Sequence, residues 1–149
     1  MPRCLPDSSV MVAVLCNWHE HHAAARAALD QRLGTGTQLV VAGPAVVETF
    51  AVLTRLPAPY RLSASDAQAL MAASFLDDTE LVALEGAMYR ELLDRALALG
   101  ALGGQVYDLV IAECARQAGV DTLLTFNARH FRRLVDRAID IVVPGEATR

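Results

Sequence analysis

The sequence contains no lysine, so arginine supplies all 13 of the basic side chains among its 149 residues. This absence excludes any mechanism that needs a catalytic lysine, and with it a phospho-acceptor signalling domain, which uses a lysine beside its acidic cluster. The phosphate-binding patterns G-x-x-x-x-G-K and G-x-G-x-x-G are also absent, which argues against a P-loop or dinucleotide-binding protein. Any contact with phosphate would be made by the planar guanidinium group of arginine.

Cysteine, charge and long apolar runs are scarce as well. The three cysteines, Cys4, Cys16 and Cys114, lie far apart and form no C-x-x-C pair, so neither a disulfide framework nor a zinc knuckle is predicted. The longest apolar stretches are about ten residues, too short to span a bilayer, and the N-terminus has no signal-peptide core. We therefore expect a cytoplasmic protein. Its net charge of -4 argues against non-specific adhesion to nucleic acid.

The chain is rich in apolar residues, which make up 54% of it, and strand-like runs alternate with helix-like runs. This alternation predicts a three-layer α/β/α sandwich around a central parallel sheet of four to five strands. We expect a single domain over residues 1–149, with the last five or six residues loose. The strands are expected at residues 3–6, 38–42, 80–84, 122–125 and 139–143. The helices are expected at residues 9–16, 20–33, 44–56, 66–76, 86–99 and 105–118.

Three carboxylates, Asp7, Glu48 and Asp108, stand at junctions between strand-like and helix-like runs, each among apolar residues. A carboxylate in such surroundings is costly to bury unless it is paired or bound to a cation. Taken alone, each has an ordinary explanation, as a helix cap, a surface acid or an acid at a helix N-terminus. Taken together they predict one site, because converging carboxylates repel one another and a hard divalent cation relieves that repulsion.

The predicted topology brings these acids to one edge of the sheet, because ligands of open parallel sheets bind beyond the carboxyl ends of the strands. Asp7 directly follows the first strand, and Glu48 follows the second after one helical turn. Thr125, Asn127 and His130 follow the fourth strand, and Asp108 begins the helix before it. This arrangement favours metal-assisted phosphodiester chemistry.

The order and spacing of four segments resemble those of PIN-domain ribonucleases, specifically VapC-type toxins of bacterial toxin–antitoxin pairs. The segments are Leu5-Pro-Asp7-Ser-Ser9-Val, Val46-Val-Glu48-Thr-Phe, Tyr107-Asp108-Leu-Val-Ile-Ala112 and Leu124-Thr-Phe-Asn127-Ala-Arg-His130-Phe. The resemblance covers nearly the whole chain. It implies a PIN-like fold and a metal-dependent endoribonuclease whose acids bind Mg²⁺ or Mn²⁺, activate water and leave 5′-phosphate and 3′-hydroxyl ends.

Residue by residue, the resemblance assigns Asp7, Glu48 and Asp108 to the metal. Ser9 matches the hydroxyl residue beside the first acid, and Thr125 matches the hydroxyl at the end of the fourth strand. Many relatives carry a further acid where this chain has Asn127 or His130. We therefore expect one strong metal site, with a second completed by substrate phosphate.

The resemblance also implies a homodimer and a cognate antitoxin that crosses the active site. Two alternatives stay open: a catalytically inactive PIN-like module that binds RNA or a partner, and a nuclease that cuts DNA with the same site.

Three weaker signals accompany these motifs. Arg129, Arg132, Arg133 and Arg137 form either a solvated helix face or a grip on RNA phosphates. His19-Glu20-His21-His22 is either a solvated loop or a metal cluster, although it lacks the H-E-x-x-H spacing. Trp18 and Tyr60 either pack under a loop or stack on bases.

Overall fold

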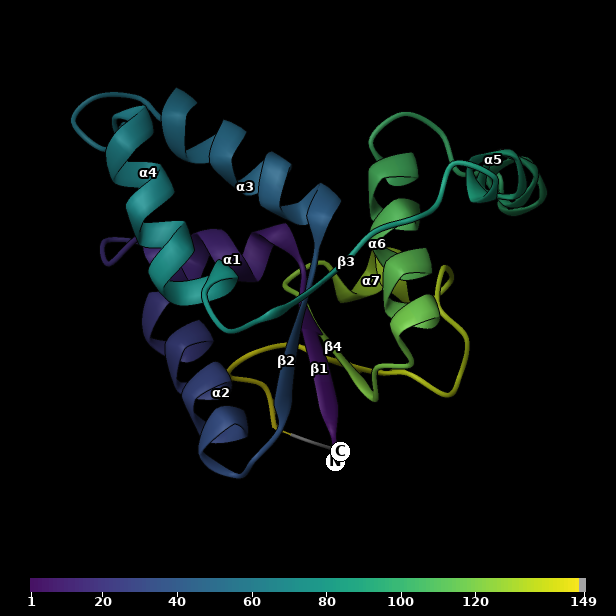
Figure 1. Cartoon of the computed structure of the whole chain (residues 1–149), viewed down its shortest axis with the longest axis horizontal. Coiled ribbons are helices and arrows are strands. Elements are labelled where there is room, and N and C mark those ends of the chain that lie inside the picture. Colours follow the sequence, from purple (N-terminus) through teal and green to yellow (C-terminus); the bar gives the residue numbers. More distant parts are fainter. Residues whose placement is uncertain (148–149) are drawn as a thin grey trace.

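The computed structural model describes residues 1–147, which form a five-stranded parallel sheet flanked by helices on both sides (Figure 1). The strands lie in the order β3-β2-β1-β4-β5, and every neighbouring pair is parallel. Their bounds are Arg3–Pro6 (β1), Gln38–Ala42 (β2), Glu80–Val82 (β3), Thr122–Leu124 (β4) and Asp140–Val142 (β5). The predicted fold class is confirmed.

The helices form the two outer layers. In Figure 1, α1 to α4 lie on one side of the sheet, and α5 to α7 lie on the other. Their bounds are Ser8–Leu15 (α1), His22–Gly34 (α2), Gly43–Arg55 (α3), Ala64–Met71 (α4), Met88–Leu99 (α5), Gln105–Ala118 (α6) and Ala128–Phe131 (α7), and a π-helical turn, η1, covers Ala72–Leu76. Within residues 1–147, no helix has both the length and the apolar character that crossing a membrane requires.

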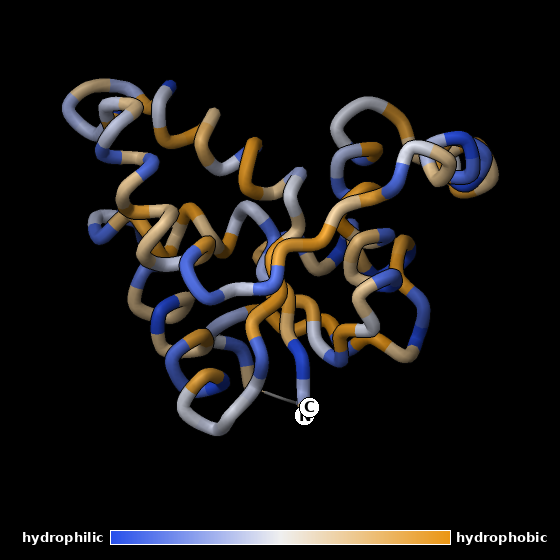
Figure 2. Tube along the Cα trace, viewed as in Figure 1, coloured by the Kyte–Doolittle hydropathy of each residue, from blue (hydrophilic) through white to orange (hydrophobic). Residues whose placement is uncertain are grey.

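The core lies between the sheet and the two helix layers. Figure 2 shows hydrophobic residues concentrated along the central strands, with hydrophilic residues on the outer turns. Leu5, Val40 and Leu123 of the three central strands are fully buried, as are Phe75 on one side and Phe131 on the other. Central strands of a parallel sheet are covered on both faces, which explains why they read as nearly continuous apolar runs.

The strand order places a topological switch point between β1 and β4. From β1, the chain moves outward to β2 and β3 through helices on one side. It then returns through α5 and α6 on the other side to enter β4, which pairs with the opposite edge of β1. Loops at such a point diverge and leave a crevice beyond the carboxyl ends of the strands. The residues after β1 and β4 therefore face this crevice.

The element boundaries differ from the prediction in a few places. Helix α2 begins at His22 rather than at residue 20, because residues 16–21 form turns instead. The helix expected at 66–76 begins earlier, at Ala64, after its cap Ser63. The short α7 was not predicted, since four residues carry no helical periodicity. The loose end expected over the last five or six residues lies partly outside the described residues.

Candidate active site

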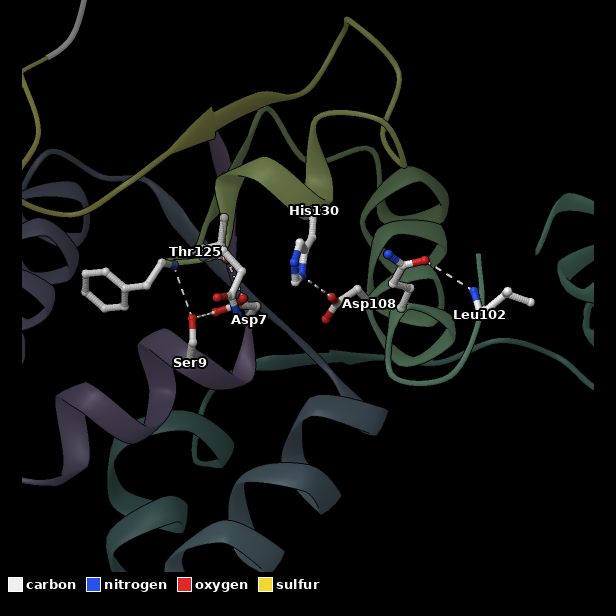
Figure 3. Close-up of polar contacts among 9 residues, drawn as sticks. Asp7, Ser9, Leu102, Asp108, Thr125 and His130 are labelled. Carbon is white, nitrogen blue, oxygen red and sulfur yellow. Dashed lines mark hydrogen bonds and ion pairs between the residues drawn. The ribbon is translucent and has the colours of Figure 1, made fainter. Parts of the chain in front are cut away.

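Asp7 occupies the switch point and is almost fully buried, with 2% of its surface exposed. It is the N-cap of α1, where its Oδ1 accepts the backbone N–H of Val10 at 3.0 Å and the hydroxyl of Ser9 at 2.6 Å. Its Oδ2 accepts the hydroxyl of Thr125 at 2.5 Å, from the segment after β4 (Figure 3). The cap explanation of Asp7 is thus correct, and the same carboxylate is also the most buried acid of the site.

The electrostatic balance of Asp7 is unfavourable to its charge. Burial raises the pKa of Asp7 to about 6, and the negative charge of Asp108 adds to this effect, while the three hydrogen bonds oppose it. No salt bridge to Asp7 is found within residues 1–147. A buried carboxylate with good hydrogen bonds but no cation is an incomplete arrangement, which a bound cation would complete.

Asp108 lies in the first turn of α6, where the helix dipole favours a negative charge. Its Oδ2 lies 3.3 Å from Nδ1 of His130 on α7. Figure 3 shows this pair beside Asp7, so the two acids come from opposite helix layers to the same end of the sheet. Burial raises the pKa of Asp108 despite the contact with His130. The predicted proximity of these two carboxylates agrees with their electrostatic coupling.

Glu48 stands apart from this pair. It lies in the second turn of α3, which starts at the carboxyl end of β2 and contacts α6, but its side chain is exposed. The side chain of Glu48 makes no salt bridge within residues 1–147, and no hydrogen bond of that side chain is found there. Nor do any three His, Cys, Asp or Glu side chains there gather closely enough to hold a metal ion. Of the three predicted ligands, Asp7 and Asp108 therefore influence each other electrostatically, while Glu48 is exposed and completes no three-residue metal group in the described part of the chain.

The polar residues around Asp7 support it from the side of β4. Thr125 is fully buried, and its hydroxyl both donates to Asp7 and accepts the backbone N–H of Asn127 at 2.8 Å. Ser9 accepts the backbone N–H of Phe126 at 3.1 Å. Ser9 and Thr125 thus fix the orientation of the Asp7 carboxylate. The side chain of Asn127 is exposed, and its backbone rather than its amide takes part in the network.

The structure separates the predicted arginines into two groups. Arg129 and Arg133 line a pocket of about 300 Å³ together with Gln105 and His130, the partner of Asp108. Arg132 lies instead beside β5, in a cavity that it shares with Asp140 and Glu146, and Arg137 lies near it. Only the first group adjoins the acids, which the spacing along the sequence could not reveal.

The sequence did not identify one buried ionic cluster. Glu113 of α6 is buried and pairs with Arg116 of the same helix and with Arg95 of α5. Glu113 follows Asp108 by five residues and so lies on a different face of α6. The signal for this cluster in the sequence was a charged residue, Glu113, in an otherwise apolar part of the helix. The pair with Arg95 ties α5 to α6 and has no contact with the acids at the switch point.

The donor set of the site fits a hard divalent cation. Oδ1 of Asp7 is saturated by two donors, but Oδ2 accepts only one and keeps a free acceptor position. Asp108 contributes a second carboxylate, of which only one oxygen faces His130. Carboxylate oxygens are the ligands that Mg²⁺ and Mn²⁺ prefer, and Mg²⁺ commonly takes one or two of them and completes its shell with water.

Comparison with known proteins agrees with this architecture. The sequence profile of the PIN domain family matches residues 4–136. The chain is 37% identical over 118 residues to Ribonuclease VapC40 of Mycobacterium tuberculosis, covering 79% of this chain and 82% of that protein. It is 34% identical over 129 residues to Ribonuclease VapC27 of the same species, covering 86% and 87%.

A solved structure also resembles it. The crystal structure of VapBC2 from Rickettsia felis, bound to a DNA fragment from their promoter, contains a chain that superposes with a TM-score of 0.68. The match covers 95% of this chain and 98% of that one, at 17% sequence identity. At that identity the likeness concerns the fold.

Proposed function

Since the chain belongs to the PIN domain family, we propose that it is a metal-dependent endoribonuclease and the toxin of a toxin–antitoxin pair. The observation that carries this proposal is the state of Asp7. This acid is buried at the switch point of a parallel sheet, held by three hydrogen bonds, coupled to Asp108 and without a salt bridge within residues 1–147. A buried carboxylate of this kind destabilises the fold when it is ionised and unpaired, and binding a cation removes that cost.

In this proposal Asp7, Asp108 and Glu48 would hold Mg²⁺ or Mn²⁺, Glu48 from its exposed position on α3. A divalent cation in such a site supplies activation of water and neutralisation of charge on the attacked phosphate. Ser9 and Thr125 keep the Asp7 carboxylate in one orientation, which limits the reorganisation needed at each turnover. Asn127 joins this network through its backbone N–H, and its exposed side-chain amide would orient a water molecule or the substrate.

The same site holds the RNA on the side of α7. Arg129 and Arg133 line the pocket next to His130, so a phosphate neighbouring the cleaved one would meet two guanidinium groups. The structure favours these two over Arg132, which shares its cavity with two acids. We expect cleavage to leave 5′-phosphate and 3′-hydroxyl ends.

The direct test is incubation of the purified chain with total cellular RNA in the presence of Mg²⁺, Mn²⁺ or EDTA, followed by mapping of the new ends. We expect new 5′-phosphate ends with either metal and none with EDTA. Asp108→Asn should lower the rate about a hundredfold or more. The matched control is Glu113→Gln, which changes an acid on the same helix away from the site. A chain that binds Mn²⁺ but leaves RNA intact would instead be the inactive binding module.

We further propose a cognate antitoxin and a homodimer as partners. The antitoxin follows from the kinship with VapC proteins, one of which is found in the VapBC2 complex. Co-expression of the small protein encoded beside the toxin should relieve the growth arrest that the toxin alone causes. The dimer is supported by α5, where Leu93 and Leu97, one helical turn apart, are 64% and 84% exposed. Sedimentation analysis measures this state directly.

A further inference from the structure

Five aromatic rings form a continuous run, and the backbone of its last residue, Phe126, is hydrogen-bonded to Ser9, the partner of Asp7. Tyr60 lies against Trp18 with ring centroids 4.3 Å apart, and Trp18 lies 6.0 Å from His19. His19 is 5.7 Å from His21, which stacks on Phe126 at 4.5 Å with an interplanar angle of 19°. We call these five residues the aromatic run. It gathers rings from the α1–α2 loop, the α3–α4 loop and the segment after β4.

Three rings of the run, Trp18, His21 and Tyr60, are exposed, whereas His19 and Phe126 are half-buried. Trp18 and Tyr60 remain 45% and 44% exposed although they contact each other, and the side chain of His21 is 47% exposed. Exposed aromatic rings that already stack on one another keep faces and edges available to a further planar group. Trp18 and Tyr60 therefore do not belong to the core, and part of each ring is left exposed.

The loop that carries three of these rings is held in place by its own hydrogen bonds. Nδ1 of His22 lies 2.8 Å from the carbonyl oxygen of Ala13 in α1, and the backbone N–H of His21 donates to Nδ1 of His19 at 3.0 Å. The backbone N–H of His19 donates to the carbonyl of Cys16 at 3.0 Å. Because the loop is ordered before any ligand arrives, little conformational entropy is lost when a ligand stacks on it. These hydrogen bonds give the three histidines of the loop a structural role that needs no bound metal ion.

The run is joined to the catalytic acids through one short chain of contacts. The backbone N–H of Phe126 donates to Oγ of Ser9, which donates to Asp7. The pocket with Arg129 and Arg133 is lined by His130, which contacts Asp108 instead. The acids therefore lie between an aromatic surface on one side and a basic pocket on the other, which suits a strand whose bases stack on one side of the cut and whose phosphates are gripped on the other.

We propose that the aromatic run is a base-stacking subsite that binds unpaired nucleotides next to the cleaved phosphate, with Trp18 and Tyr60 as its main contacts. This inference rests on the proposed ribonuclease function and adds binding residues that the acidic cluster does not include. Stacking on aromatic rings tolerates any base, because every base has a π face. The subsite therefore selects for unpaired bases rather than for a sequence.

Trp18 is the only tryptophan of the chain, so its fluorescence reports the subsite directly. The probe is a single-stranded oligoadenylate of about 12 nucleotides, titrated into the full chain in EDTA so that no cleavage takes place. We expect quenching of Trp18, and binding on the order of tenfold weaker in Tyr60→Ala. The matched control is Tyr89→Ala, since Tyr89 is similarly exposed, at 46%, but lies on α5 outside the run. It should bind as tightly as the wild type.

An abasic oligomer of the same length and charge separates stacking from phosphate binding. Binding is followed here by the anisotropy of a dye at the 5′ end of each oligomer, which does not depend on Trp18. We expect the abasic oligomer to bind the wild type about tenfold more weakly than oligoadenylate, and to bind the wild type and Trp18→Ala alike. If the loop variant fails to fold, His21→Ala gives the same comparison. Equal affinity of the wild type for both oligomers, or no change on removing the rings, would overturn the subsite. If RNA is cleaved in Mg²⁺ while these binding results are negative, the inference fails alone and the ribonuclease function stands.

Discussion

Replacing Asp7 by asparagine should make the metal-free protein more stable and inactive at the same time. Asparagine has nearly the shape of aspartate and can keep the local hydrogen bonds. Its carbonyl oxygen accepts from Ser9 and Val10, and its amide donates to the Thr125 hydroxyl, which also accepts from the backbone of Asn127. The substitution therefore removes the charge and also the acceptor of the buried Thr125 O–H, a loss that does not depend on pH.

The magnitude follows from the pKa of Asp7, which burial raises from 3.8 to about 6. A raised pKa means that the folded state prefers the protonated carboxyl. Below about pH 3.8 the carboxyl is protonated in both the folded and the unfolded state, so the free energy of unfolding is not lowered. The loss of stability grows as the pH rises above 3.8 and reaches its full value above about pH 6. Two pKa units at about 1.4 kcal/mol each give roughly 3 kcal/mol of lost stability at neutral pH. The side-chain amide of the Asp7→Asn variant does not titrate and avoids this loss.

The assay is urea denaturation of both proteins in EDTA, followed by circular dichroism. The difference in free energy of unfolding between Asp7→Asn and the wild type should increase by about 2 kcal/mol from about pH 4.5 to about pH 8. Adding Mg²⁺ should then stabilise the wild type and leave the variant unchanged, since only the native site binds the ion. A stability difference that stays constant between about pH 4.5 and about pH 8 in EDTA would overturn this prediction, because the charge of Asp7 would then cost the folded state nothing.

Three further outcomes are expected. Glu113→Gln should lower the free energy of unfolding by about 1–2 kcal/mol, because it weakens a buried carboxylate shared by two half-exposed arginines, and denaturation should show this with cleavage per folded molecule unchanged. Arg129→Ala should raise KM for RNA and should make the dependence of cleavage on salt concentration less steep, by the amount expected for about one lost phosphate contact. Arg132→Ala should change neither quantity. Leu97→Asp should convert a dimer to a monomer in sedimentation experiments.

The sequence was sufficient to predict the sheet because its central strands carry strong local signals. The apolar run that ends at Pro6 is followed by an acid, and the one that ends at Ala42 is followed by glycine and proline. In the structure, β1 and β2 begin and end at the predicted residues. Helix α6 also matches its prediction, because Gly119 adopts the left-handed conformation, with φ of 62°, that ends a helix well. Short elements without periodicity, such as α7, gave no such signal.

Side-chain geometry was harder to predict. The topology rule correctly brought Asp7 and Thr125 together, since β1 and β4 are neighbours at the switch point. It could not decide whether Glu48, a full turn into α3, would face the same crevice, because helix rotation depends on packing rather than on strand order. Nor could it pair His21 with Phe126, which lie more than a hundred positions apart in the sequence.

If Asp7, Asp108 and Glu48 share one divalent cation, titration of Mn²⁺ into the purified chain should show it, with free Mn²⁺ followed by electron paramagnetic resonance. We expect one strong site per chain, weakened about tenfold or more by Asp108→Asn and by Glu48→Gln, and unchanged by Glu113→Gln. A wild-type chain that binds no Mn²⁺, or variants that all bind it as tightly as the wild type, would rule out a shared metal site.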